Sequence, residues 1–206
     1  MSRLALCRSA VRARVVAAGW GWSGIGLAIV AFLIAAYGVA IGFKQTPKEH
    51  DRLRVLSVDD LGFDEDPEFE TLTRRAFIDG RMAIDYEYDP PDGELAISFS
   101  YVRERTALAA RELSADQRAL TRFLEKRTGL DEATVDHPNM PTWGEEPLTR
   151  VTLLDGEPFG FTVDVRKGRH VFNIMITGVD IELDELDEVL CAVLERSVRL
   201  ARGLVH

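Results

Sequence analysis

Hydrophobic and polar positions divide the chain into one unbroken apolar stretch and a longer part in which the two kinds of residue alternate. From Val15 to Phe43 no residue carries a charge, a run of 29 residues. A helix of that length exceeds the roughly 30 Å hydrocarbon core of a bilayer. The pattern predicts a basic tail over 1–14, a single transmembrane helix over 15–43 that binds the lipid bilayer, and a polar linker over 44–69.

Alternation of apolar and polar residues predicts six β-strands in a soluble domain over 70–206. The strands form two groups of three, and short turns with glycine, such as Asp79-Gly80 and Lys167-Gly168, join neighbouring strands into hairpins. The predicted strands cover residues 72–78, 82–88, 95–101, 151–153, 159–165 and 170–176.

One helix is expected after each group of strands. Ser114 and Gln117 form a capping box at the start of the first helix, and Gly129 ends it. The apolar residues predicted on one face of this helix are Ala119, Leu120, Phe123 and Leu124. The second helix starts at about Leu183 and ends at Gly203. Because the strands come in hairpins, the predicted class is α+β, with an antiparallel six-stranded sheet packed with helices.

Charge separates the two parts of the chain and excludes one class of partner. The formal net charge is −9, yet residues 1–44 carry five basic residues and no acid, which leaves −14 on the rest. A domain this acidic repels phosphate backbones, so no nucleic acid is expected as a partner. Cys7 and Cys191 lie on opposite sides of the apolar run, so no disulfide is expected within the domain.

The apolar segment also predicts a location. Basic residues flank it almost equally, and the α-amino group favours a cytoplasmic N-terminus with the domain extracytoplasmic at the cell inner membrane. Cleavage after Ala40, as at a signal-peptidase site, is a second interpretation, and a mitochondrial transit segment leading to the mitochondrial inner membrane is a third. Gly38 and Gly42 stand four residues apart, a spacing that predicts a helix-dimer face and hence a homodimer.

The end of the chain resembles a known group of domains. The residues that carry the resemblance are the strands Gly160–Val165 and Gly168–Ile174 and the helix Leu183–Leu200. Together with the order of elements, they are similar to the PsbP/Mog1-like group. The resemblance implies an α/β/α sandwich with accessory or binding roles, and it transfers no functional residue.

The sequence contains no group of residues at a spacing typical of a catalytic or metal-binding site, so no catalytic residue, metal ligand or cofactor is predicted. His137 lies beside Trp143 in a proline-rich loop over 131–149, which we predict to be a candidate binding loop. His170 alternates with Phe172 on a strand, as expected of a partly buried, hydrogen-bonded histidine.

Three functions remain open at this point. The preferred hypothesis is a membrane-anchored, non-catalytic binding or accessory module that takes a protein partner or an apolar ligand between sheet and helix. The second is an anchored hydrolase whose acid and base are Asp136, His137 and Glu145. The third is a structural dimeric tether that pairs through Gly38 and Gly42.

Overall fold

A computed structural model describes residues 41–63, 66–91, 95–128, 134–137, 140–155, 157–178 and 183–203. The chain divides into two compact units, Met1–Gly42 and Phe43–His206. The second unit is described below by itself.

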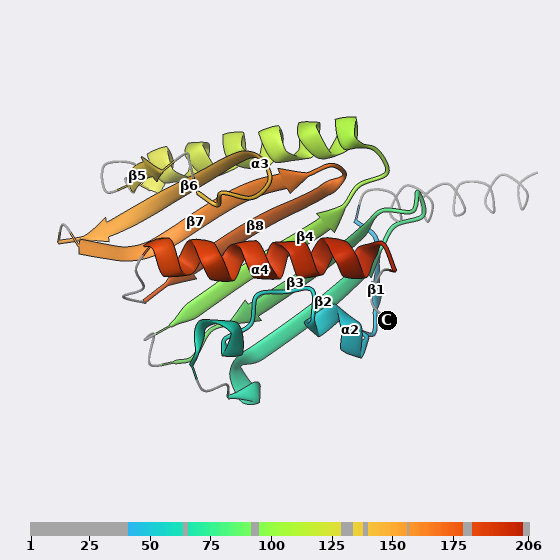
Figure 1. Cartoon of the computed structure of the whole chain (residues 1–206), viewed down its shortest axis with the longest axis horizontal. Coiled ribbons are helices and arrows are strands. Elements are labelled where there is room, and N and C mark those ends of the chain that lie inside the picture. The colour runs from blue at the N-terminus through green and yellow to red at the C-terminus, as the bar shows by residue number, and fades with distance from the viewer. Residues whose placement is uncertain are drawn as a thin grey trace, which may run out of the picture. The chain divides into compact units, whose positions relative to one another are not determined.

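Eight antiparallel strands form one sheet in the order β1-β2-β3-β4-β8-β7-β6-β5 (Figure 1). Each half of the sheet is a run of four consecutive strands, and the halves meet where β4 pairs with β8. The strands are β1 (Phe43–Gln45), β2 (Glu70–Ala76), β3 (Met82–Tyr88), β4 (Ala96–Arg103), β5 (Thr134–His137), β6 (Glu145–Leu154), β7 (Glu157–Lys167) and β8 (His170–Thr177).

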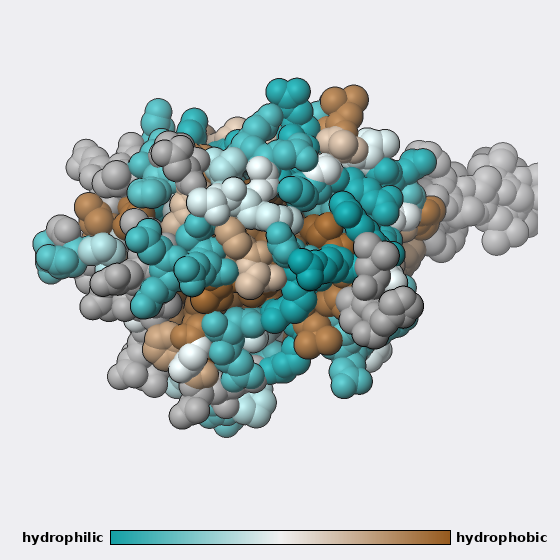
Figure 2. Space-filling view, in the orientation of Figure 1, coloured by the Kyte–Doolittle hydropathy of each residue, from teal (hydrophilic) through white to brown (hydrophobic). Residues whose placement is uncertain are grey.

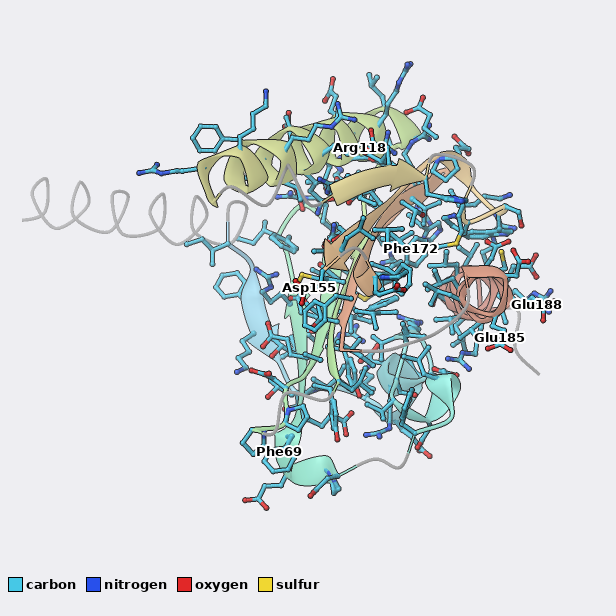
Figure 3. All side chains as sticks on the ribbon, turned by 90° about the vertical axis from the view of Figure 1, so that its left-hand side faces the viewer. Phe69, Arg118, Asp155, Phe172, Glu185 and Glu188 are labelled. Atoms are coloured by element: carbon cyan, nitrogen blue, oxygen red, sulfur yellow. The ribbon has the colours of Figure 1, made fainter. Side chains whose placement is uncertain are left out.

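Helices follow each half of the sheet. A long helix, α3 (Ala107–Thr128), follows β4, and α4 (Leu183–Ala201) follows β8. Three short turns of helix lie between β1 and β2, namely α2 (Glu49–Arg52), η1 (Asp59–Leu61) and η2 (Pro67–Phe69). Figures 1 and 3 show α4 on one side of the sheet and α3 on the other.

The fold class predicted from the sequence is wrong in two respects. The sheet has eight strands rather than six, because β1 and β5 are edge strands of three and four residues, too short to show an alternating pattern. Among the described residues, no helix is long and apolar enough to cross a bilayer. Phe43, the predicted end of the transmembrane helix, begins β1, and Gly42 before it has a φ of 78°.

Several predictions concern residues outside the described part. Gly38, Ala40 and the remainder of the predicted transmembrane segment lie there, so the helix-dimer face, the cleavage site, the membrane orientation and the mitochondrial alternative stay predictions. Gly42 is described, and it directly precedes a strand.

One face of the sheet carries the hydrophobic core. Alternate residues of the central strands point to this face, and α4 packs Leu186, Leu190 and Leu194 against them, all with no exposed surface. Figure 2 views the molecule from this side, where hydrophilic side chains cover much of the surface. Burial of this many large apolar side chains is the main source of stability in a domain of this size.

The segment predicted to be a polar linker belongs to the folded domain. Val55, Leu56 and Val58 are fully buried in the core cluster. Asp51 is also fully buried, and its carboxylate holds the segment against β2 through Arg74. The domain therefore starts at β1 and not at residue 70.

Candidate binding surface

The two residues of the predicted binding loop have different surroundings. His137 ends the edge strand β5, opposite Thr149 of β6, and its side chain is exposed. Trp143 instead packs edge-on against the buried ring of Phe172, with ring centroids 6.1 Å apart, and the Lys167 ammonium lies 5.0 Å from the Trp143 ring. Trp143 is therefore half-buried against the core, whereas the side chain of His137 is exposed.

The two acidic residues of the predicted hydrolase site, Asp136 and Glu145, differ in their exposure and contacts. Asp136 is exposed on β5. Glu145 binds Arg166 at 2.6 Å and accepts the Gly168 backbone N–H at 2.9 Å. The hydrogen bond from Gly168 and the charge of Arg166 lower the pKa of Glu145, so this carboxylate holds its charge and ties β6 to the β7–β8 turn.

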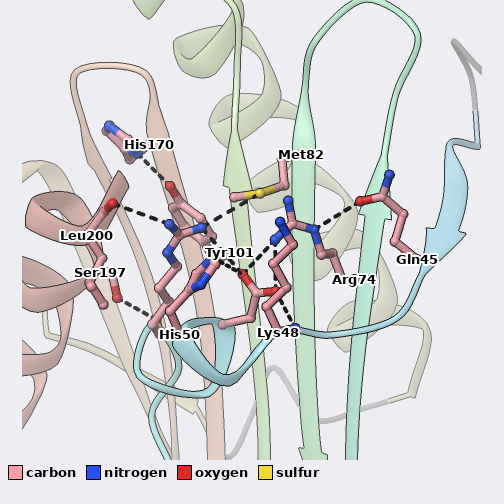
Figure 4. A network of polar contacts seen from close by, with 11 residues as sticks. Gln45, Lys48, His50, Arg74, Met82, Tyr101, His170, Ser197 and Leu200 are labelled. Atoms are coloured by element: carbon pink, nitrogen blue, oxygen red, sulfur yellow. Dashed lines mark hydrogen bonds and ion pairs between the residues drawn. The ribbon is translucent and has the colours of Figure 1, made fainter. Parts of the chain in front are cut away.

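His170 is buried and hydrogen-bonded, as the sequence predicted. Its Nδ1 atom lies 2.9 Å from the hydroxyl of Tyr101, and 4% of the residue is exposed. Burial lowers the pKa of His170 to about 4 and raises the pKa of Tyr101 to about 12, so both side chains are neutral at physiological pH. The pair fills the core beside the end of α4 (Figure 4).

A network of buried charges surrounds this pair (Figure 4). Arg74 places one guanidinium nitrogen 2.9 and 2.8 Å from the two carboxylate oxygens of Asp51. Arg54 donates to the carbonyl of Leu200 at 3.3 Å, near the C-terminal end of α4, while the Ser197 hydroxyl donates to the carbonyl of Arg54. These contacts fasten the segment after β1 to the sheet and to α4, which is a structural role.

The opposite face of the sheet is polar. A row of side chains crosses the middle strands, where Asp85, Ser100, Asn173 and Asp164 occupy paired positions on β3, β4, β8 and β7. The Ser100 hydroxyl donates to Asp85 at 2.8 Å, and the Asn173 amide donates to Asp164 at 2.6 Å. Arg75 extends the row onto β2 with an ion pair to Asp85 at 2.7 Å.

The helix α3 divides this polar face into a covered and an open half. It runs beside β7 and β8, and Arg118 on α3 donates to the carbonyl of Glu146 on β6. Its buried positions carry small side chains, Ala110 and Ser114. Beneath it, burial raises the pKa of Asp164, although the Asn173 hydrogen bond and the charges of Arg150 and Arg118 oppose the shift.

The open half forms a shallow hollow of about 370 Å³ over β2, β3 and β4. Most of its lining side chains are hydroxyls and carboxylates, and Arg75 is its single basic group. The lining residues are Thr71, Thr73, Arg75, Asp85, Glu87, Ser98, Phe99 and Ser100.

Two other hollows adjoin α3. One, of about 450 Å³, lies between the start of α3 and the β2–β3 turn, with Glu104, Glu112 and Asp116 among its lining residues. The other, of about 430 Å³, lies between α3 and β6, with Arg118 and Arg122 in its wall. Of the α3 residues, Glu112 and Asp116 thus lie on one flank of the helix, and Arg118 and Arg122 lie on the other.

Sequence reasoning missed the residues of the open half for a specific reason. The alternation of Asp85 and Glu87 with Ile84 and Tyr86 showed that these acids point away from the core. It did not show that β4 pairs with β8, nor that α3 covers only the β8 side. Those long-range pairings decide which polar positions stay accessible.

Comparison with known proteins gives no family for this chain. The PsbP/Mog1-like resemblance therefore stays a prediction. No family model, no curated protein and no solved structure matches the sequence or the fold described here.

Proposed function

We propose that this domain is a non-catalytic binding module that holds a basic, extended segment of a protein partner on the open polar half of its sheet. The observation that carries the proposal is the hollow over β2, β3 and β4, with its two carboxylates and four hydroxyls. Sheet faces that stay free of a covering layer and keep accessible hydrogen-bonding groups suit a polar ligand.

The charge of the hollow favours a basic ligand. Arg75 is paired with Asp85, which leaves Glu87, an exposed residue, as the main charge toward solvent. The neighbouring hollow at the start of α3 adds to the same potential, because four acids outnumber two arginines in its lining. These residues are Asp79, Glu104, Glu112 and Asp116, with Arg81 and Arg105. The domain as a whole is acidic, so a basic partner is attracted from a distance and at a faster rate.

The spacing of the hydroxyls favours an extended polypeptide. Side chains on one face of a strand recur every second residue, which is about 6.6 Å. An extended peptide laid along the strands has the same repeat. Its lysine or arginine side chains then lie opposite Glu87, and its backbone groups lie opposite the hydroxyls of Thr71, Thr73 and Ser98. This supports a peptide segment over a compact cation.

The test is a titration of the full-length protein with a short fluorescein-labelled peptide of alternating lysine and serine, followed by fluorescence anisotropy. We expect Glu87→Gln to weaken binding by up to about fivefold, since an exposed ion pair is worth up to about 1 kcal/mol. The matched control is Glu195→Gln on α4, which removes the same charge from the opposite face.

Two results would count against the proposal. Equal weakening by Glu87→Gln and Glu195→Gln would mean that the peptide responds only to net charge. Equally tight binding of a peptide with the same charge but a helix-forming sequence would argue against the extended geometry.

A further inference from the structure

Exposed apolar side chains gather at one end of the sheet. Phe43 begins β1, Ile78 lies in the β2–β3 turn and Leu108 is in the first turn of α3, and they are 40%, 54% and 66% exposed. Figure 1 shows β1, this turn and the start of α3 at the same end. Leu120 and Phe123, on the outer face of α3, are 58% and 57% exposed, but they lie about three turns or more further along the helix. Grouped exposed apolar residues indicate an interaction surface.

Basic residues outnumber acids at this same end. Where the strands end there, in the turns beyond them and just after α4, nine of the described residues are basic and four are acidic. With the three apolar residues they make up what we call the basic end. The basic residues are Lys44, Arg75, Arg81, Arg103, Arg105, Arg166, Lys167, Arg169 and Arg202, and the acids are Asp79, Glu104, Glu145 and Glu146.

The four acids of the basic end form ion pairs within it. Arg81 lies 2.8 Å from Asp79 and 3.6 Å from Glu104, and Arg166 lies 2.6 Å from Glu145 and 3.8 Å from Glu146. Because Arg75 is paired with Asp85, six basic residues are left to set the potential.

The effect of these cations is felt by His170, which lies among them. Burial lowers the pKa of His170, and the charges of Arg169, Arg103 and Arg202 lower it further. Three of the six cations therefore lie close enough together to act on one side chain.

The opposite end of the sheet is rich in acids, although Lys126 and Arg127 lie there at the end of α3. The acids lie at the start of β2, in the β6–β7 turn and in the first turn of α4, namely Glu68, Glu70, Asp155, Glu157, Asp184 and Glu185. Charge is thus separated along the strands. Near a negatively charged surface, this separation turns the basic end toward that surface.

We propose that the basic end docks on the surface of an anionic lipid bilayer. Apolar side chains enter the head-group region of a bilayer, while lysine and arginine side chains contact the anionic lipids. A nucleic acid offers phosphates but no apolar layer for Phe43, Ile78 and Leu108. The chain also reaches Phe43 from its charge-free run over 15–43, so its most apolar segment joins the domain at this end.

Docking in this way leaves the open half of the sheet accessible. The strands run away from the bilayer, so the hollow over β2, β3 and β4 opens to the side. Glu112 and Asp116 lie more than one turn beyond the start of α3 and therefore belong to the side of the domain as well. The proposal does not depend on peptide binding in the hollow.

A fluorescent probe on the full-length protein tests the docking. Ile78→Cys, in a chain that also carries Cys7→Ser and Cys191→Ser, is labelled with an environment-sensitive dye and mixed with vesicles of equal parts phosphatidylserine and phosphatidylcholine. We expect spin-labelled lipids in these vesicles to quench the dye. The matched control is a dye at Phe159→Cys, a position 40% exposed at the opposite end, which should stay unquenched.

Charge reversal at the basic end tests the electrostatic part. One lysine or arginine near an anionic surface contributes about fivefold to binding, so Arg105→Glu with Arg169→Glu should weaken docking by about twentyfold or more. Lys126→Glu with Arg127→Glu changes the net charge equally at the far end of α3 and should leave the quenching at residue 78 unchanged. All four side chains are on the surface, and circular dichroism checks that both variants fold.

Several results would overturn the proposal. These are failure of the unaltered protein to associate with the anionic vesicles, equal quenching at residues 78 and 159, and equal quenching at residue 78 in vesicles of phosphatidylcholine alone. Equal weakening by the two charge reversals would mean that only net charge matters. Competition of a single-stranded oligonucleotide with the vesicles, lost in Arg105→Glu with Arg169→Glu, would assign the basic end to nucleic acid instead.

Discussion

Two buried aspartates, one on each face of the sheet, have pKa shifts of opposite direction. Asp51 on the core face is 0% exposed and Asp164 on the polar face is 2% exposed. Burial alone would raise the pKa of Asp51, yet hydrogen bonds from Arg74 and the Lys48 backbone outweigh it and the pKa is lowered. Burial dominates at Asp164, and its pKa is raised.

The difference lies in the number of donors that each carboxylate receives. Arg74 reaches both oxygens of Asp51, the Lys48 N–H adds a bond at 2.9 Å, and Arg54 lies 3.5 Å away. Asp164 accepts one amide hydrogen bond from Asn173, and its second oxygen has no hydrogen-bond partner among the described residues. The surroundings of Asp51 therefore favour its ionised form in the folded protein, and those of Asp164 disfavour it.

The largest expected effect comes from Asp51→Asn. This change leaves the Arg74 guanidinium buried without its counter-charge, and removing one partner of a buried ion pair costs about 3–5 kcal/mol. Urea denaturation of the purified protein measures the free energy of unfolding. Asp85→Asn on the polar face is the matched control, because its pair with Arg75 is partly exposed and is worth less than about 1 kcal/mol. Equal losses of unfolding free energy in the two variants would show that the ion pairs on the two faces contribute equally to stability.

A smaller effect is expected when the pH falls. The pKa of Asp51 is lower in the folded state than its ordinary value of 3.8, so its stabilisation is complete above pH 4 and is lost as pH falls through the folded pKa. Between pH 5 and pH 2, the unaltered protein should therefore lose more stability than Asp51→Asn. Urea titrations at several pH values measure both slopes, and parallel slopes would contradict the role assigned to Asp51.

The sequence predicted local structure well and surfaces poorly. Alternation identified β3 and β8, and the Leu183 helix appears as α4, because their apolar residues face one core with a regular period. The region around Asp51 showed no hydrophobic period, because its three buried apolar residues, Val55, Leu56 and Val58, stand among charged residues. The burial of Asp51 itself depends on Arg74, 23 positions away in the sequence.

The exposed face of α3 escaped prediction for a related physical reason. Apolar residues on one side of a helix usually mark the side that packs on the protein. Here the sheet face below α3 is polar, with Asp164, Asn173 and Arg166 at its outward positions, so small and polar helix residues meet it. Only knowledge of the sheet face shows which side of α3 turns outward.

Asp164→Asn has the smallest expected effect, and unlike the other changes it is expected to raise the free energy of unfolding. Since the folded pKa of Asp164 is raised, the ionised carboxylate opposes folding above that pKa, and the penalty fades as pH falls toward the ordinary value of 3.8. An amide keeps the shape and the contact with Asn173 without the buried charge. We therefore expect a gain in stability at pH 7 that disappears below about pH 4. A loss of stability at pH 7 would mean that Arg150 and Arg118 compensate this charge as fully as Arg74 compensates Asp51, and the contrast between the two faces would then have to be abandoned.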